Sequence, residues 1–252
     1  MTERIQPKME QQVVGDSRVK HVNGPHQLPV ERYYAEFEDP IKLIPELCNH
    51  FYHLGWASGT GGGLSIRQNG YIYCAPSGVQ KELMRPDEMF ILDEASLRFL
   101  RKPVDATLRV SECLSLFLVP FRERQAGCCI HSHSIHANLV TRLKNDGKPI
   151  NEFRISHEEM IKGIKIGSSN SNLRYSDTLV VPVINNVLQE SDLVGALRQA
   201  VLDYPDTNAV LVRNHGVYIW GRDWKQAKSM AECYDYLFKL KLEAMRMGLD
   251  YN

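Results

Sequence analysis

Two histidines separated by a single residue, His131 and His133, form the pair in this chain best suited to chemistry. Residues 127–130 before them are typical of a β-strand, and side chains two positions apart in a strand point to the same face. Two adjacent imidazoles suit zinc, and a catalytic zinc site uses three protein ligands and leaves one position open. His215 is the best candidate for the third ligand, because it lies in a tight Asn-His-Gly turn at 214–216. Two histidines exposed on an edge strand would show the same spacing. The pair therefore favours a metal site only together with the turn at 214–216 and the loops described next.

A glycine-rich loop at residues 59–63 offers backbone N–H groups with little side-chain hindrance, which suits a phosphate. It is neither a Walker loop nor a dinucleotide fingerprint, because no Lys-Ser/Thr follows it and a strand comes next. A tight turn without a ligand is the competing interpretation. Ser77, Gly78 and Ser111 provide further donors, and Ser111 is predicted near a helix N-terminus, which favours anions.

Two carboxylates, Glu158 and Glu159, follow the histidine pair in the sequence Ser-His-Glu-Glu-Met at 156–160. Either could act as a general base or as a zinc ligand. The alternative is a solvated first turn of a helix, where acidic residues favour the helix dipole. Composition and spacing alone therefore predict a zinc-dependent enzyme that acts on a small phosphorylated substrate.

The elements that would position these residues can be predicted along the chain. Asp39-Pro40 is an N-cap signal, apolar residues then repeat at helical spacing, and Gly55 ends the pattern. Asn69-Gly70 between two short β-rich runs predicts a hairpin. A helix near residues 111–124, a strand at 127–133 and a helix from Ser134 follow.

The last third is predicted as a strand at 179–184, a capped helix at 191–202, two strands at 209–213 and 217–220, and a long helix after Asp223 that ends at Gly248. The apolar stripe of that helix is expected to be core or subunit interface. Hairpins mixed with helices predict one α/β layered domain with a largely antiparallel or mixed sheet. Residues 1–38 lack periodicity and are interpreted as a flexible leader.

Charge and composition exclude several classes of protein. The chain has 252 residues, and 30 Lys+Arg balance 30 Asp+Glu, which argues against a nucleic-acid partner. No window approaches the run of about 20 apolar residues that a membrane span needs. The N-terminus lacks a secretory signal pattern, so a cytoplasmic location with six reduced cysteines is expected.

Six motifs, taken in order, resemble the class II aldolase/adducin superfamily over about residues 39–248. They are Gly-Thr-Gly-Gly-Gly-Leu-Ser (59–65), Ala-Pro-Ser-Gly-Val-Gln-Lys-Glu (75–82), Ser-Glu-Cys (111–113), His-Ser-His (131–133), His-Glu-Glu-Met-Ile-Lys-Gly (157–163) and Arg-Asn-His-Gly-Val-Tyr-Ile-Trp-Gly (213–221). The resemblance implies a single α/β/α layered domain at 39–252 with a central, mainly antiparallel sheet. It also implies a homotetramer with active sites near subunit boundaries.

The resemblance also assigns roles to individual residues. It implies that one Zn²⁺ per subunit is held by His131, His133 and His215, that Glu159 is the catalytic acid/base, and that Cys113 contacts the substrate beside the metal. The substrate would be a small phosphorylated sugar, its phosphate held by Gly61, Gly62, Ser77, Gly78 and Ser111. In the sugar-phosphate aldolases of the superfamily an acidic residue serves in this region, so Cys113 favours a dehydratase that removes water from a phosphorylated 2-keto sugar over an aldolase.

Two other functions fit parts of the same pattern. A class II aldolase or epimerase acting on a different pentulose phosphate would cleave a carbon–carbon bond or exchange stereochemistry without losing water. A non-catalytic, adducin-like module that binds cytoskeletal protein would need no metal and would be expected to carry a long basic tail. The presence of all three candidate ligands and Glu159 favours the enzyme.

Overall fold

The computed structural model describes residues 39–249. The predicted leader, residues 1–38, lies outside the described residues, so the domain boundary at residue 39 stays a prediction.

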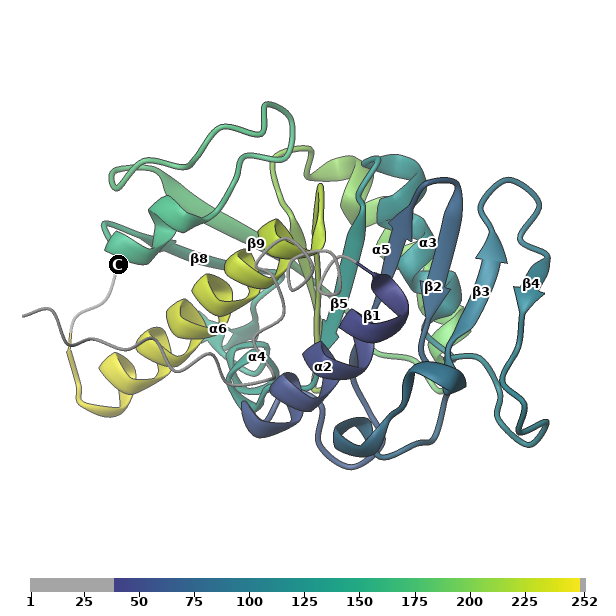
Figure 1. The fold of residues 1–252 in the computed structure, drawn as a ribbon. Helices are drawn as coiled ribbons and strands as arrows, with labels where there is room; N and C mark the ends of the chain where they lie inside the picture. The colour runs from purple at the N-terminus through teal and green to yellow at the C-terminus, as the bar shows by residue number, and fades with distance from the viewer. Residues whose placement is uncertain (1–38, 250–252) are drawn as a thin grey trace, which may run out of the picture.

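A nine-stranded sheet forms the centre of the molecule (Figure 1). Its strands are β1 (Gly63–Gln68), β2 (Tyr71–Cys74), β3 (Phe90–Asp93), β4 (Phe99–Arg101), β5 (Cys128–Ser132), β8 (Glu152–Ser156), β9 (Thr178–Ile184), β10 (Ala209–Val212) and β11 (Gly216–Gly221). Their spatial order is β4-β3-β2-β1-β5-β11-β10-β9-β8, and β6 (Lys144–Asn145) pairs separately with β7 (Lys148–Pro149). Neighbours in the large sheet run antiparallel except β9 and β10, which are parallel. The predicted mainly antiparallel sheet is confirmed.

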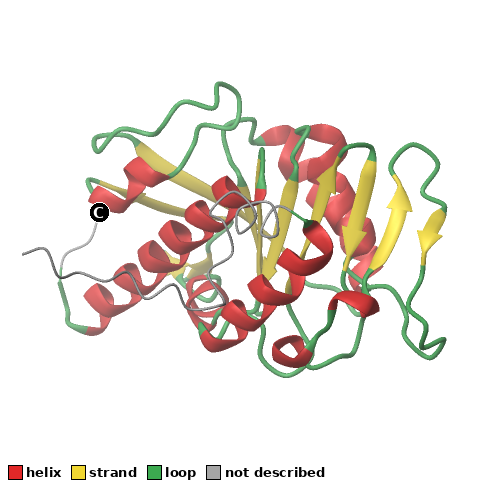
Figure 2. Ribbon diagram, viewed as in Figure 1, coloured by secondary structure: helices red, strands yellow, loops and turns green. Residues whose placement is uncertain are grey.

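Helices cover both faces of this sheet (Figure 2). They are α2 (Pro40–His53), α3 (Leu114–Glu123), α4 (Ile135–Val140), α5 (Val194–Asp203) and α6 (Trp224–Arg246). Short 3₁₀ helices are η1 (Lys81–Leu83), η2 (Pro86–Glu88), η3 (Glu159–Gly163) and η4 (Glu190–Leu193). In Figure 1, α2 and α6 cross the front of the sheet, and α3 and α5 lie behind it.

The alternation of side chains along the central strands creates two hydrophobic cores. Ile130 of β5 packs with α2, α4 and α6 in one core, whereas Cys129 packs with α3 and α5 in the other. The same alternation in β11 sends Ile219 to the first core and Tyr218 to the second. Because side chains alternate across a strand, one buried sheet supports helices on both faces. The α/β/α layering is thereby confirmed.

Local signals set the N-terminal elements where the sequence predicts them. The Asp39 side chain accepts a hydrogen bond from the Ile41 N–H and caps α2, with Pro40 at its first position. Asn69 and Gly70 have φ values of 53° and 79°. Positive φ at both central residues is the requirement of a type I′ turn, which matches the twist of the β1–β2 hairpin.

One predicted helix begins later than expected. The sequence predicts a capped helix from Ser191, but α5 begins at Val194 and its N-cap residue, Leu193, has no side-chain capping bond. Residues 190–193 instead form η4, anchored by the fully buried Leu193. We infer that burial of this leucine stabilises the 3₁₀ turn more than a capping bond from Ser191 would stabilise an earlier helix start. Among residues 39–249, no helix is both long and apolar enough to cross a bilayer.

Candidate metal centre and active site

The central strand β5 positions the histidine pair. It lies between β1 and β11, and its register places His131 opposite Gly63 on one side and Tyr218 on the other. The His131 ring stacks on Tyr218 with centroids 4.1 Å apart and planes inclined by 6°. His133 follows directly after the strand, where its N–H donates to the Trp56 carbonyl at 2.8 Å. Both rings point to the same side of the sheet, as the spacing predicts.

The turn between β10 and β11 brings His215 to the same place. The Arg213 guanidinium donates to the carbonyls of Thr141 and Ile150, each at 2.8 Å, and the Asn214 N–H donates to Thr141 Oγ1 at 2.9 Å. Gly216 then passes so close to β5 that a Cβ atom on it would lie 2.1 Å from the Ser132 carbonyl oxygen. Only glycine fits this approach, so the predicted role of the turn has a steric cause.

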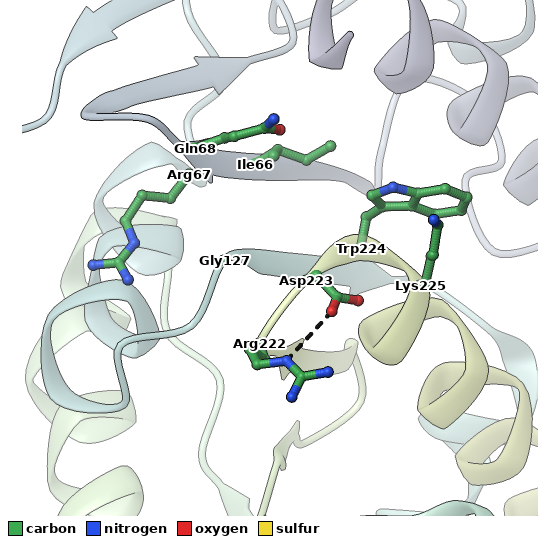
Figure 3. A pocket seen from close by; sticks show the side chains of 8 residues that line it. All are labelled: Ile66, Arg67, Gln68, Gly127, Arg222, Asp223, Trp224 and Lys225. Carbon is green, nitrogen blue, oxygen red and sulfur yellow. Dashed lines mark hydrogen bonds and ion pairs between the residues drawn. The ribbon is translucent and has the colours of Figure 1, made fainter. Parts of the chain in front are cut away.

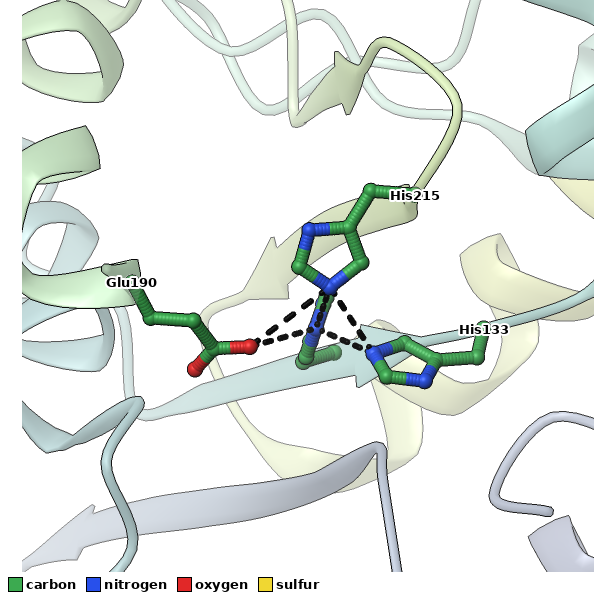
Figure 4. Close-up of side chains that lie close together, drawn as sticks. His133, Glu190 and His215 are labelled. Atoms are coloured by element: carbon green, nitrogen blue, oxygen red, sulfur yellow. Dashed lines mark hydrogen bonds and ion pairs between the residues drawn. The ribbon is translucent and has the colours of Figure 1, made fainter. Parts of the chain in front are cut away.

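The three imidazole rings meet at their Nε2 atoms. Figure 4 shows His133 and His215 turned toward each other. The Nε2 separations are 2.9 Å from His133 to His131, 3.0 Å from His215 to His133 and 3.2 Å from His131 to His215. His131 Nδ1 lies 3.2 Å from the Val217 carbonyl oxygen, which can only accept, so this nitrogen carries the proton. His131 Nε2 therefore presents a lone pair to the other two rings.

Burial keeps these histidines neutral. It is the largest cause that lowers the pKa of His131 well below the ordinary value, and the neighbouring His133 and His215 lower it further. Burial, His215 and Lys81 lower the pKa of His133 to about 4, and burial also lowers the pKa of His215. Neutral imidazoles are the form that binds metals.

A carboxylate that sequence reasoning did not single out completes the group. Glu190, the first residue of η4, lies with His131, His133 and His215 in a set whose candidate ligand atoms are all within 4.8 Å of one another. Its Oε1 is 3.5 Å from His215 Nε2 and 3.8 Å from His131 Nε2. The sequence gives no signal for it, since it stands alone in a polar segment far from every motif.

Cys113 lies beside this carboxylate. Its thiol donates to Glu190 Oε2 at 2.8 Å, and the residue is the N-cap of α3. Burial first, and then the charge of Glu190, raises the pKa of the Cys113 thiol far above its ordinary value. The cysteine is therefore a neutral donor next to the histidines, close to the place where the resemblance predicts it.

The donor set fits a metal ion such as zinc. Zinc–nitrogen bonds of about 2.0–2.1 Å place tetrahedral ligand atoms about 3.3–3.4 Å apart, close to the observed Nε2 separations. Converging lone pairs repel one another unless a cation or a proton lies between them, and the lowered pKa values of the three histidines disfavour the proton. The site is thus compatible with a metal on its own chemistry.

The glycine-rich loop packs directly against the histidines. A Cβ atom on Gly61 would lie 2.5 Å from Cε1 and Nδ1 of the His133 ring. Gly62 has φ of +72°, and a Cβ there would lie 2.7 Å from the Trp56 carbonyl oxygen. The Gly61 N–H donates to the Ser58 carbonyl at 3.3 Å. The two glycines make room for the metal site, and phosphate binding by them stays a prediction.

The other predicted phosphate donors lie on two paired segments. The Ser77 N–H donates to the Arg109 carbonyl at 2.7 Å, and the Ser111 N–H donates to the Ala75 carbonyl at 3.0 Å. Ser111 Oγ accepts from the Cys113 N–H at 3.3 Å, which places this serine two residues from the thiol beside Glu190. Gly78 has φ of +69° and allows the tight turn after Ser77.

Glu159 is not brought to the histidines within its own chain. It begins η3, its side chain is 75 % exposed, and it pairs with Lys162 at 2.6 Å. The described residues that gather around the histidine nitrogens include Glu190 but not Glu159. Its catalytic role stays a prediction.

A separate pocket of about 340 Å³ lies at the other end of the same strands (Figure 3). Residues 66–68, Gly127 and residues 222–225 line it, and Arg222 pairs there with Asp223 at 3.5 Å. Ile66 of this pocket pairs with Cys128 at the start of β5, whereas the histidines lie at the end of that strand. The pocket contains no predicted site residue, and its size alone does not make it the site of chemistry.

Comparison with known proteins identifies the class. The family model for the Class II Aldolase and Adducin N-terminal domain matches residues 42–242. In solved structures, an L-fuculose 1-phosphate aldolase superposes with a TM-score of 0.64 at 16% identity, covering 84% of this chain and 88% of that chain. The L-fuculose-1-phosphate aldolase from Thermus thermophilus gives a TM-score of 0.59 at 17% identity, covering 87% and 99%. These likenesses establish the fold, and the chain belongs to the class II aldolase and adducin family.

Proteins of similar sequence identify the enzyme family within this superfamily. Methylthioribulose-1-phosphate dehydratases from Osmerus mordax and Bos taurus are each 50% identical to this chain over 213 residues. The alignments cover 84% of this chain and 87% and 86% of those proteins. The Salmo salar dehydratase is 51% identical, with 84% and 83% covered. The chain therefore belongs to the methylthioribulose-1-phosphate dehydratase family of hydro-lyases, which confirms the predicted enzyme class.

Proposed function

We propose that this protein dehydrates 5-methylthioribulose 1-phosphate to 2,3-diketo-5-methylthiopentyl 1-phosphate, a step of methionine salvage, with zinc as its metal. The observation that carries the proposal is the convergence of His131, His133 and His215 at Nε2 separations of 2.9–3.2 Å, in a chain 50% identical to dehydratases of that name. Lewis-acid polarisation of the substrate carbonyl at C2 is the chemistry that zinc supplies when bound.

Glu159 is the proposed acid/base. Its carboxylate takes the proton from C3 and then gives that proton to the hydroxyl at C4, which leaves as water. The double bond between C3 and C4 carries the remaining hydroxyl on C3, and this enol ketonises to the 2,3-diketone. A positioned acid/base of this kind typically contributes about 10²–10⁴-fold to the rate.

The exposure of Glu159 supports a site shared between subunits. In its own chain the carboxylate is 75 % exposed and lies outside the histidine group. We propose a cytoplasmic homotetramer in which Glu159 of one chain serves the histidines of a neighbouring copy. Closed symmetric assemblies place such contacts at every equivalent interface.

The phosphate is proposed to bind among the loops that adjoin the histidines. Gly61 touches His133, and Ser111 is linked by a hydrogen bond to Cys113, so both loops reach the edge of the metal site. Gly61 and Gly62 on one loop, with Ser77, Gly78 and Ser111 on the other two segments, would fix C3 of the substrate relative to the base. Fixing a reacting atom in this way lowers the entropic part of the barrier.

The direct test is mass spectrometry of the purified protein incubated with methylthioribulose 1-phosphate, beside a sample stripped by a chelator. Metal-dependent loss of one water supports the proposal. Carbon–carbon cleavage products would assign an aldolase instead. Unchanged substrate in the presence of zinc-loaded protein would show that the substrate is wrong.

A further inference from the structure

We propose that Glu190 is a fourth protein ligand of the metal centre, and that Cys113 positions its carboxylate. This inference rests on the proposed function, because it assumes that the three histidines hold a metal. The resemblance predicts that Cys113 contacts the substrate. In this proposal Cys113 instead acts on the metal indirectly, by positioning the Glu190 carboxylate.

The distances place Glu190 at the remaining corner of the group. Its Oε1 lies 3.5 Å from His215 Nε2 and 3.8 Å from His131 Nε2, compared with Nε2 separations of 2.9–3.2 Å among the histidines. Ligand atoms on a tetrahedral zinc lie about 3.3–3.4 Å apart. The oxygen is close to this distance from His215 and His131, and it would have to move nearer to His133, from which it lies within 4.8 Å, to occupy the fourth corner. Figure 4 shows the carboxylate pointing at the ring nitrogens.

Among residues 39–249, no lysine or arginine lies within ion-pair distance of Glu190. Within residues 39–249, its ion-pair contacts within 4.0 Å are with His131 and His215 alone. Its side chain is only 24 % exposed. A carboxylate at this depth without a lysine or arginine partner is stabilised by a nearby cation, and a bound divalent ion would supply one.

Cys113 fixes which oxygen faces the histidines. The thiol donates to Oε2 at 2.8 Å, which leaves Oε1 directed at the ring nitrogens. The two residues are held by different helices that pack together, because Cys113 caps α3 and Glu190 begins the turn leading into α5. Hydrogen bonds to metal-binding carboxylates orient them in the same way as those to metal-binding histidines. The substrate would then replace the carboxylate or add as a fifth ligand.

The test compares Glu190→Gln with Asp192→Asn in the full-length chain. Asp192 lies on the same 3₁₀ helix and is exposed, so its substitution removes the same charge without touching the histidines. Zinc affinity is measured by competition with a chelator, and the ligand field is read from the absorption of the cobalt-loaded protein. We expect Glu190→Gln to weaken zinc binding by at least the about 10–100-fold typical of changes outside the ligand shell and to change the cobalt spectrum, and Asp192→Asn to do neither.

Glu190→Ala checks that the glutamine does not act as a ligand itself, and it should weaken binding at least as much. Wild-type affinity and an unchanged cobalt spectrum in both Glu190 variants would overturn the inference while leaving the three-histidine site intact. Failure of the wild-type chain to bind metal would overturn the zinc assignment as well. The two failures are therefore distinguishable.

The positioning role of Cys113 has its own readout. Cys113→Ala should weaken zinc binding less than Glu190→Gln, and Cys113→Ser should recover affinity because it keeps a hydrogen-bond donor. The double variant with Glu190→Gln should bind zinc no more weakly than Glu190→Gln alone, since the thiol acts through the missing carboxylate. Additive losses of affinity would show that Cys113 acts on the metal or the fold independently.

Discussion

The histidine group and the segment that carries Glu159 differ in how the fold holds them. His131 is buried in the central strand and stacked on Tyr218, and the turn of His215 is closed by Gly216 against β5. Glu159 stands on a 3₁₀ helix with its side chain 75 % exposed. The histidine group, the proposed metal half of the site, is therefore assembled by sheet register within one chain, whereas Glu159, the proposed acid/base half, is not brought to it.

This difference has a physical basis. The His131 ring is fixed by stacking on Tyr218 and by its hydrogen bond to the carbonyl of the buried Val217. Glu159 is held by an exposed ion pair with Lys162, a type of contact worth about 0–1 kcal/mol. Such a pair is easily exchanged for another partner, as the proposed site shared between subunits requires.

The largest expected effect is that of His133→Ala, which removes one of the converging nitrogens. We expect loss of zinc and of turnover together, beyond the about 10–100-fold losses typical of changes outside the ligand shell. Metal content by elemental analysis and turnover by the dehydration assay check this. Full zinc retention would refute the ligand assignment.

Glu159→Gln should lower turnover by about 10²–10⁴-fold and leave zinc content and folding unchanged. Glu158→Gln is the matched control, because it makes the same change one residue earlier, and it should retain most turnover. A near-normal rate for Glu159→Gln would remove this residue from the mechanism.

Hybrid oligomers test whether the histidines and Glu159 of one active site come from different chains. When the inactive His133→Ala and Glu159→Gln chains are mixed equally and assemble at random, a site shared between chains should recover about one quarter of wild-type turnover. In a site built from one chain, every active site keeps one defect. No recovery in oligomers shown to be mixed would therefore contradict the shared site.

Gly216→Ala tests whether steric closure builds the metal half. Its Cβ would lie 2.1 Å from the Ser132 carbonyl oxygen, so β5 and β11 must separate. We expect a loss of about 1–3 kcal/mol in the free energy of unfolding, with weaker zinc binding. Gly195→Ala is the control, because a Cβ on this α5 residue meets nothing within 4 Å, and it should not destabilise the chain. Equal denaturation midpoints for the two variants would argue against the steric role of Gly216.

The convergence of His131, His133 and His215 could be predicted because its signals are local. The spacing of His131 and His133 follows the strand period, and the Asn-His-Gly turn identifies His215. Glu190 escapes sequence reasoning because only the packing of η4 on α3 brings it to the histidines. The misplaced start of the helix after β9 has the same origin, since burial of Leu193 sets that segment. Tertiary contacts that override local propensity are not visible in one sequence.

The smallest effect is a pH dependence of stability in the metal-free protein. The pKa of His133 is about 4 in the folded chain, and an unfolded histidine has a pKa of about 6.5. Between these values the unfolded state binds more protons than the folded state, so the free energy of unfolding must fall as the pH falls from about 6.5 to about 4. The lowered pKa values of His131 and His215 act in the same direction.

Urea denaturation of the metal-free chain across this range measures the slope. His133→Asn should flatten it, because one proton-binding difference is removed. His50→Asn, the same substitution at an exposed position of α2, is the matched control. A slope that is the same in the His133 variant and the wild type would mean that the ring is already accessible to protons in the folded protein. The metal half would then be no more rigid than the segment of Glu159, and the contrast between the two regions would disappear.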